Sequence, residues 1–273
     1  MIEAALFAIG VIGFGLAGYL DLKKTEFPGW IPYGLIAASV LVFSLDGLIT
    51  GGFSLLTNSV LYGLVFLAIG LGLYFSRQWG DGDAWLLGAL GFALPSRLIF
   101  PEQASITPFY FALFFNFLVV ALVYTIVYSI ALGFRDVKTR KRFFSEAEKG
   151  LRYKIVSIIV VAVAFLAVYF YLSSISTWTA AYVLLLPPLF AFFVFFTDYT
   201  RIMEKHVFRK KVLTKNLRPG DVVLGGKWRG LTKQDIKKIR KKYVIVKEGI
   251  RLAPVFLITF LLTVLFGALV WFV

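Results

Sequence analysis

The side chains that could carry out chemistry in this 273-residue chain are mainly carboxylates. The sequence contains no cysteine, which excludes a disulfide, a thiolate nucleophile and a cysteine-ligated metal. Its single histidine, His206, makes a histidine-based zinc site or a Ser–His dyad a poor hypothesis, so we expect no metal and no cofactor. Three acids stand apart from the rest: Asp21 follows an apolar run, whereas Asp81 and Asp83 precede another.

Two carboxylates at one site are suited to the activation of water by acid–base chemistry. If they lie close together, one keeps its proton and polarises a carbonyl, while the other accepts a proton from water. Gly80 and Gly82 flank Asp81 and allow unusual dihedral angles and the close approach of a substrate strand. A helix beginning just after Asp83 favours negative charge there, so our hypothesis makes Asp83 the more acidic partner and Asp21 the proton holder.

The elements that must position these acids are membrane helices. Hydrophobic residues make up 59% of the chain, charged residues 16%, and the mean hydropathy is +0.83. Soluble domains average about 45–50% apolar and about 25% charged residues, so a soluble enzyme and a disordered chain are excluded. A span needs about 20 apolar residues. We therefore predict an all-α polytopic membrane protein with about eight transmembrane helices, at 2–20, 31–49, 56–75, 84–100, 107–133, 155–172, 178–197 and 252–273.

The basic residues indicate the orientation of these spans. Of the 29 Lys and Arg residues, 17 lie between Arg201 and Arg251, and a further 8 lie between Arg135 and Lys154. Both segments fall on one side of the predicted topology, which the positive-inside rule assigns to the cytoplasm. We therefore expect a multi-pass plasma membrane protein with both termini outside. The net charge of +14 then indicates anionic lipid headgroups as partners and no nucleic acid.

This topology predicts that Asp21, at the end of the first span, and Asp83, at the start of the fourth, lie at the same depth. Both would face the cytoplasm from different helices. Acids beside the bilayer suggest a functional site. Besides hydrolysis, two other classes remain open: a proton- or ion-coupled transporter that uses the same acids, and a membrane scaffold in which the acids are unrelated.

The sequence Asp21-Leu-Lys-Lys-Thr-Glu-Phe-Pro28-Gly-Trp-Ile-Pro32, followed later by Gly80-Asp81-Gly82-Asp83, resembles the archaeal preflagellin and type IV prepilin peptidases. These are polytopic GxGD aspartyl proteases. The resemblance implies that Asp21 and Asp83 are catalytic and that Asp81 occupies a variable position. It also implies that the substrates are archaellin or pilin precursors, whose short basic leader ends in Gly before a long apolar helix.

The same resemblance raises the question of how a basic leader is recruited to a basic protein surface. Four acids near the expected cytoplasmic face are candidates: Glu26, Asp81, Glu146 and Glu148. Only residues 21–30 separate the first two spans, where bacterial relatives carry a long Cys-rich loop, so no N-methyltransferase domain is expected.

We predict four segments: a catalytic membrane core (1–135), further transmembrane helices (136–198), a small basic α+β cytoplasmic domain (199–251) inserted before the last helix, and that C-terminal helix (252–273). The cytoplasmic domain should contain strands at 222–224 and 243–246, a turn at 217–221, and a helix at 236–242 capped by Thr232.

The first span, which begins with an acid rather than a base, is expected to remain as a membrane helix. Both acids lie within the first four spans, so the chemistry should not require residues beyond about 200. The oligomeric state stays open.

Overall fold

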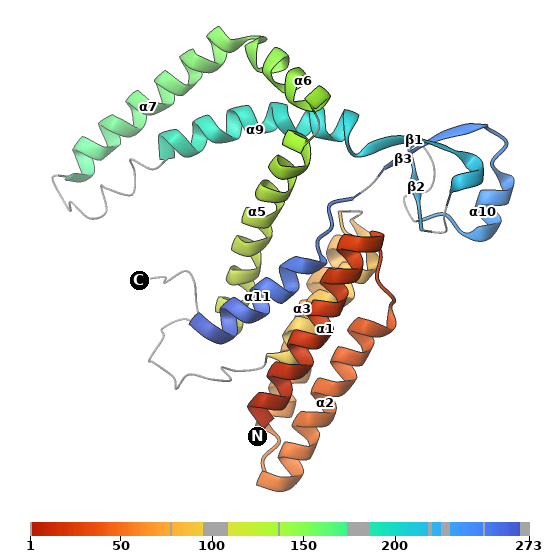
Figure 1. The fold of residues 1–273 in the computed structure, drawn as a ribbon. Coiled ribbons are helices and arrows are strands. Elements are labelled where there is room, and N and C mark those ends of the chain that lie inside the picture. Colours follow the sequence, from red (N-terminus) through yellow and green to blue (C-terminus); the bar gives the residue numbers. More distant parts are fainter. Residues whose placement is uncertain are drawn as a thin grey trace. The chain divides into compact units, whose positions relative to one another are not determined.

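A computed structural model describes two separate units of the chain (Figure 1). The first unit combines Met1–Val127 with Ile250–Val273, and the second unit is Tyr128–Gly249. The residues described are 2–76, 78–94, 109–135, 137–173, 186–217, 220–224, 230–247 and 249–267. The first unit contains α1 (Ile2–Lys24), α2 (Trp30–Thr50), α3 (Ser54–Phe75), α4 (Asp81–Ala93), most of α5 (Phe109–Arg135) and α11 (Ala253–Phe266).

Five helices are long and apolar enough to cross a membrane, which confirms a helical multi-pass membrane protein. They are Glu3–Lys24, Trp30–Thr50, Ser54–Phe75, Phe109–Arg135 and Leu151–Tyr171. The helices α4, with 13 residues, and α11, with 14, are shorter than a span over their described lengths. Parts of four expected spans (95–100, 107–108, 178–185 and 268–273) lie outside the described residues, as do Arg77, Arg97 and Glu102. The count of eight spans therefore stays a prediction.

Close contacts at glycine hold α3 against α4. A Cβ atom added at Gly70 would lie 2.6 Å from the carbonyl oxygen of Ala84, so only glycine permits this backbone approach. The buried hydroxyl of Ser59 donates a 2.7 Å hydrogen bond to the carbonyl oxygen of Phe92, further along the same pair of helices. These contacts fix the position of α4 and hence of the acids in its first turn.

The C-terminal helix α11 packs against α1 and belongs to the core of the first unit (Figure 1). Gly10 of α1 makes room for the ring of Phe260, which is fully buried. Buried Asn116 of α5 donates hydrogen bonds to Thr263 Oγ1 at 3.0 Å and to the carbonyl oxygen of Gly267 at 2.7 Å. The two ends of the chain thus form one helical core.

The second unit contains the end of α5 and the elements α6 (Val137–Glu148), α7 (Leu151–Ser173), α9 (Leu186–His206), β1 (Arg209–Leu213), the 3₁₀ turn η1 (Thr214–Asn216), β2 (Val222–Val223), α10 (Lys233–Lys238) and β3 (Tyr243–Lys247). An ion pair of 2.5 Å between Lys154 and Asp198 joins α7 to α9. Buried Tyr199 of α9 donates a hydrogen bond of 2.5 Å to the carbonyl oxygen of Ser129 on α5.

A three-stranded antiparallel sheet in the order β1-β3-β2 completes the second unit. Val244 and Val246 alternate with exposed neighbours along β3 and pack on Leu217 and Leu231. The strands expected at 222–224 and 243–246 are confirmed as β2 and β3, and the capping box at Thr232 is present. Residues 218–219 of the expected turn lie outside the described residues.

The helix expected to reach residue 242 ends at Lys238 instead. The following segment extends toward β3, and the carbonyl oxygen of Lys242 accepts a hydrogen bond of 3.1 Å from the N–H of Thr214. Pairing with the segment after β1 therefore overrides the helical preference of the lysine run. The strand β1 was not expected from the sequence.

Candidate active site

Asp21 lies in the last turn of α1 and is buried, with 7% of its surface exposed. Its Oδ2 accepts a hydrogen bond of 3.0 Å from the backbone N–H of Ala253, the first residue of α11. A carboxylate near the negative end of its own helix is unfavourable, whereas one at the N-terminus of another helix is stabilised. The contact with α11 therefore compensates for the position of Asp21 at the end of α1.

Asp83 lies in the first turn of α4, where Gly80 is the N-cap residue. The backbone of Gly80 is extended, with φ −75° and ψ 157°, and its N–H donates a hydrogen bond to the Asp83 carboxylate. This is one half of a capping box, in which the third helical residue satisfies the N–H of the cap. Asp83 is half-buried, whereas Asp81 is exposed.

The segment between α1 and α2 brings the two helix ends together. The ring of Phe27 lies against Gly82, where an added Cβ atom would be 2.7 Å from the end of the ring. The negative charge of Asp21 acts on Asp83, so the two carboxylates are electrostatic neighbours. Asp21 and Asp83 thus lie at the same end of the first unit, on the helices that the sequence assigned to them.

The prolines of the motif shape this connection. The carbonyl oxygen of Pro28 accepts a hydrogen bond of 3.1 Å from the N–H of Ile31, and buried Pro32 lies in the first turn of α2. Proline suits a first helical turn because the N–H it lacks would have no partner within the helix. The turn that holds Phe27 also contains Thr25 with φ 64°, a left-handed conformation that is rare outside glycine.

The structure adds two residues, Trp79 and Arg251, that the sequence did not single out for this site. Trp79 packs against Phe256 of α11, with ring centroids 6.5 Å apart. Arg251 donates a hydrogen bond to the carbonyl oxygen of Leu22, and its charge acts on Asp21. A helix start at 252–254, marked by Pro254, is the sequence signal that could have placed α11 beside Asp21.

This arrangement bears on two expectations. The site includes a hydrogen bond from Ala253, a residue beyond 200, which the expected catalytic core does not contain. The burial of Asp21 opposes negative charge on it, whereas the N–H of Ala253 and the charge of Arg251 favour it, so the assignment of the proton to Asp21 stays a prediction.

The other acids have partners of their own or lie at the surface. Glu146 pairs with Lys149 at 2.7 Å, and Glu148 is the exposed last residue of α6. Glu26 is exposed in the segment between α1 and α2. Within the described residues, no group of three His, Cys, Asp or Glu side chains is arranged to hold a metal ion.

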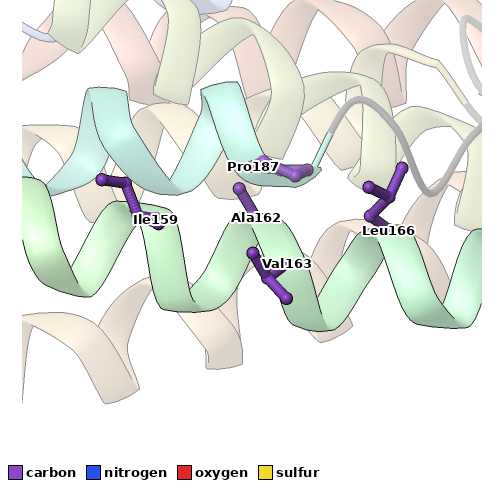
Figure 2. Close-up of a pocket in the computed structure, with 5 residues that line it drawn as sticks. All are labelled: Ile159, Ala162, Val163, Leu166 and Pro187. Carbon is purple, nitrogen blue, oxygen red and sulfur yellow. The ribbon is translucent and has the colours of Figure 1, made fainter.

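A hollow in the second unit is lined by apolar side chains and not by groups that could activate water. Figure 2 shows the residues that line it, four on α7 and Pro187 on α9. Its volume is about 330 Å³. It is lined by the apolar residues Ile159, Ala162, Val163, Leu166 and Pro187. The helix α7 is exposed and apolar on most sides, as expected of a surface that contacts lipid chains.

The chain is similar to known proteins over its N-terminal half. The model of the type IV leader peptidase family matches residues 8–139. A preflagellin peptidase of Methanococcus voltae is 29% identical over 104 residues, which is 38% of this chain and 44% of that relative. The match therefore spans less than half of the relative's length. No solved structure matches the chain significantly. The family match contains Asp21 and residues 80–83, whereas Arg251 and α11 lie beyond it.

Proposed function

We propose, from the match of residues 8–139 to the type IV leader peptidase family, that the chain is a membrane aspartic endopeptidase. It removes the short basic leader from archaellin or type IV pilin precursors. One observation carries the proposal: Asp21 and Asp83, from two separate motifs, are electrostatic neighbours at one end of the first unit.

The two carboxylates divide the work of peptide hydrolysis. Ionised Asp21, which accepts the N–H of Ala253, takes a proton from a water molecule as that water attacks the scissile carbonyl carbon. Protonated Asp83 donates a hydrogen bond to the carbonyl oxygen and stabilises the negative charge that develops there. The tetrahedral intermediate then breaks its C–N bond, and the proton taken by Asp21 passes to the departing amine.

This assignment reverses our initial hypothesis about the proton. Two neighbouring carboxylates do not both ionise easily. The N–H of Ala253 and the positive charge of Arg251 both favour the ionised form of Asp21, so we assign the proton to Asp83.

The active site faces the cytoplasm in this proposal, and the termini lie outside. Lys23, Lys24 and Arg251 lie at the same end of the first unit as Asp21, which agrees with the positive-inside rule. The apolar helix of a precursor would lie among the spans while its basic leader stays in the cytoplasm. This position brings the scissile bond to the depth of the aspartates.

Anionic lipid headgroups are the second partner that we propose. The segment from Arg201 to Arg251 contains 17 Lys and Arg residues, and each basic residue near an anionic leaflet adds about 1 kcal/mol of attraction. Recruitment of a basic leader therefore depends on local acids and on the apolar helix rather than on long-range attraction.

The function is tested with protein reconstituted in vesicles and supplied with archaellin and pilin precursors. We expect mass spectrometry to find a single cut between the basic leader and the apolar helix. Asp21→Asn and Asp83→Asn should each remove the cut, while both variants still insert. If every precursor stays intact and the vesicles instead conduct protons through the unmodified protein, the ion-coupled transporter is the better description.

A further inference from the structure

We propose that Arg251 and the N-terminus of α11 are a positioning element of the active site, which orients the Asp21 carboxylate and places a cation beside it. This inference rests on the proposed function, because it concerns the aspartate assigned as the base. It extends the site beyond residues 8–139, the range that the family model matches. The last helix, which follows the whole second unit in sequence, thereby becomes part of the catalytic core.

The first argument is that α11 has no cap of its own. Its N-cap residue is Leu252, whose side chain cannot accept a hydrogen bond, and the first N–H groups of any helix lack partners within that helix. Asp21 supplies the missing acceptor to Ala253 from 232 positions earlier in the sequence. The same bond satisfies the helix terminus and fixes the carboxylate.

The second argument concerns Arg251. Its guanidinium donates a hydrogen bond to the carbonyl oxygen of Leu22, one of the last-turn carbonyls of α1 that have no partner within the helix. It also places a positive charge beside Asp21. A cation at this position favours negative charge on Asp21 and complements the negative end of α1.

The third argument is the backbone contact that brings the two helix ends together. A Cβ atom added at Gly18 would lie only 3.2 Å from the Cα of Pro254, so the start of α11 lies directly against α1. Further along α1, a Cβ atom added at Gly15 would lie 4.0 Å from Cδ2 of Leu257. At Gly10 the missing side chain leaves room for the ring of Phe260. Small residues on α1 therefore set the depth at which the N–H of Ala253 meets Asp21.

The kinetic test compares Arg251→Ala, Arg251→Lys and a control, Arg140→Ala, which changes an exposed arginine of α6. Arg251→Ala should lower kcat about tenfold with little change in KM, as expected for the loss of one charge-assisted hydrogen bond. The acid limb of its pH–rate profile should move to higher pH by about one unit, because the base loses a neighbouring cation. Arg251→Lys should restore the position of that limb, and Arg140→Ala should match the parent.

A second measurement does not depend on activity. The chain has no cysteine, so a disulfide can report the contact alone. Gly18→Cys with Pro254→Cys should cross-link on oxidation, and so should the roomier pair Gly15→Cys with Leu257→Cys. The control pair, Gly34→Cys with Leu257→Cys, should not, because Gly34 faces open space.

The two measurements separate the possible failures. If Arg251→Ala keeps the parent's rate and pH profile, the positioning role is wrong even when the protein cleaves precursors. If neither cross-link forms, the contact between α1 and α11 is wrong. If the parent cleaves no precursor but both cross-links form, the proposed function fails while the contact stands.

Discussion

Asp83 accepts a hydrogen bond from the backbone N–H of Gly80, three residues before it, and so caps the helix in which it lies. This relationship gives Asp83 a structural role that is independent of catalysis. A loss of cleavage on replacing Asp83 is therefore informative only if the cap is retained. The side chain at this position can be chosen to separate the two roles.

Asp83→Glu is expected to abolish cleavage without destabilising the protein. Glutamate is the preferred residue at the third helical position of a capping box, so the bond to Gly80 should survive while the carboxyl group moves. Cleavage should fall by at least about 100-fold, the usual contribution of general acid–base catalysis. The thermal unfolding midpoint in detergent should stay at the parent's value. Substantial cleavage by this variant would mean that Asp83 acts only as a cap.

Replacements of Asp21 should also separate its role in cleavage from its role in capping α11. Asp21→Asn keeps an oxygen that accepts the N–H of Ala253, whereas Asp21→Ala removes the acceptor. Both variants should be inactive, but only Asp21→Ala should lose about 1 kcal/mol of stability, the typical value of a helix cap. Equal stability of the two, measured by thermal unfolding, would mean that the hydrogen bond contributes nothing.

The positions of Asp21 and Asp83 on their helices could be predicted because they depend on local patterns. Apolar runs and the distribution of lysine and arginine indicate the spans and their direction, and these place both acids at one end. The hydropathy pattern suggested that the fourth span begins at residue 84, whereas α4 begins at Asp81. The difference arises because Gly80 supplies the cap and Asp83 completes it.

The contacts of Arg251 and Phe27 could not be predicted in this way. Leu252 gives no capping signature at the start of α11, and the partner of that helix is far away in the sequence. The approach of Phe27 to Gly82 depends on the left-handed backbone at Thr25, which is unusual for this residue type. The strand β1, which has three basic residues in succession, forms through its pairing with β3.

Asp81→Ala should leave most of the cleavage intact, because the side chain of Asp81 is exposed and lies at the variable position of the motif. Removing its negative charge should make the neighbouring Asp83 give up its proton more readily. The alkaline limb of the pH–rate profile should therefore move to lower pH. A folded but inactive Asp81→Ala variant would mean that the wrong member of the motif was assigned to catalysis.

Chelators should have no effect on cleavage, since water is activated by the carboxylates in the proposed mechanism. The check is a rate measurement before and after extended treatment with EDTA, followed by addition of single divalent ions. A chelator-sensitive rate that one ion restores would overturn the two-aspartate mechanism.

Gly82→Ala tests how closely the turn between α1 and α2 must approach α4. The added methyl group would lie 2.7 Å from the ring of Phe27, so that ring must move away from the start of α4. Cleavage should fall about tenfold, as expected when small displacements disturb the geometry of reacting groups. Phe27→Ala is the matched variant, because it removes the ring that collides. In the double variant, Gly82→Ala should cost little beyond the effect of Phe27→Ala alone, which a double-mutant cycle on kcat/KM measures. Additive losses would show that Gly82 serves something other than this contact, such as the approach of the substrate strand.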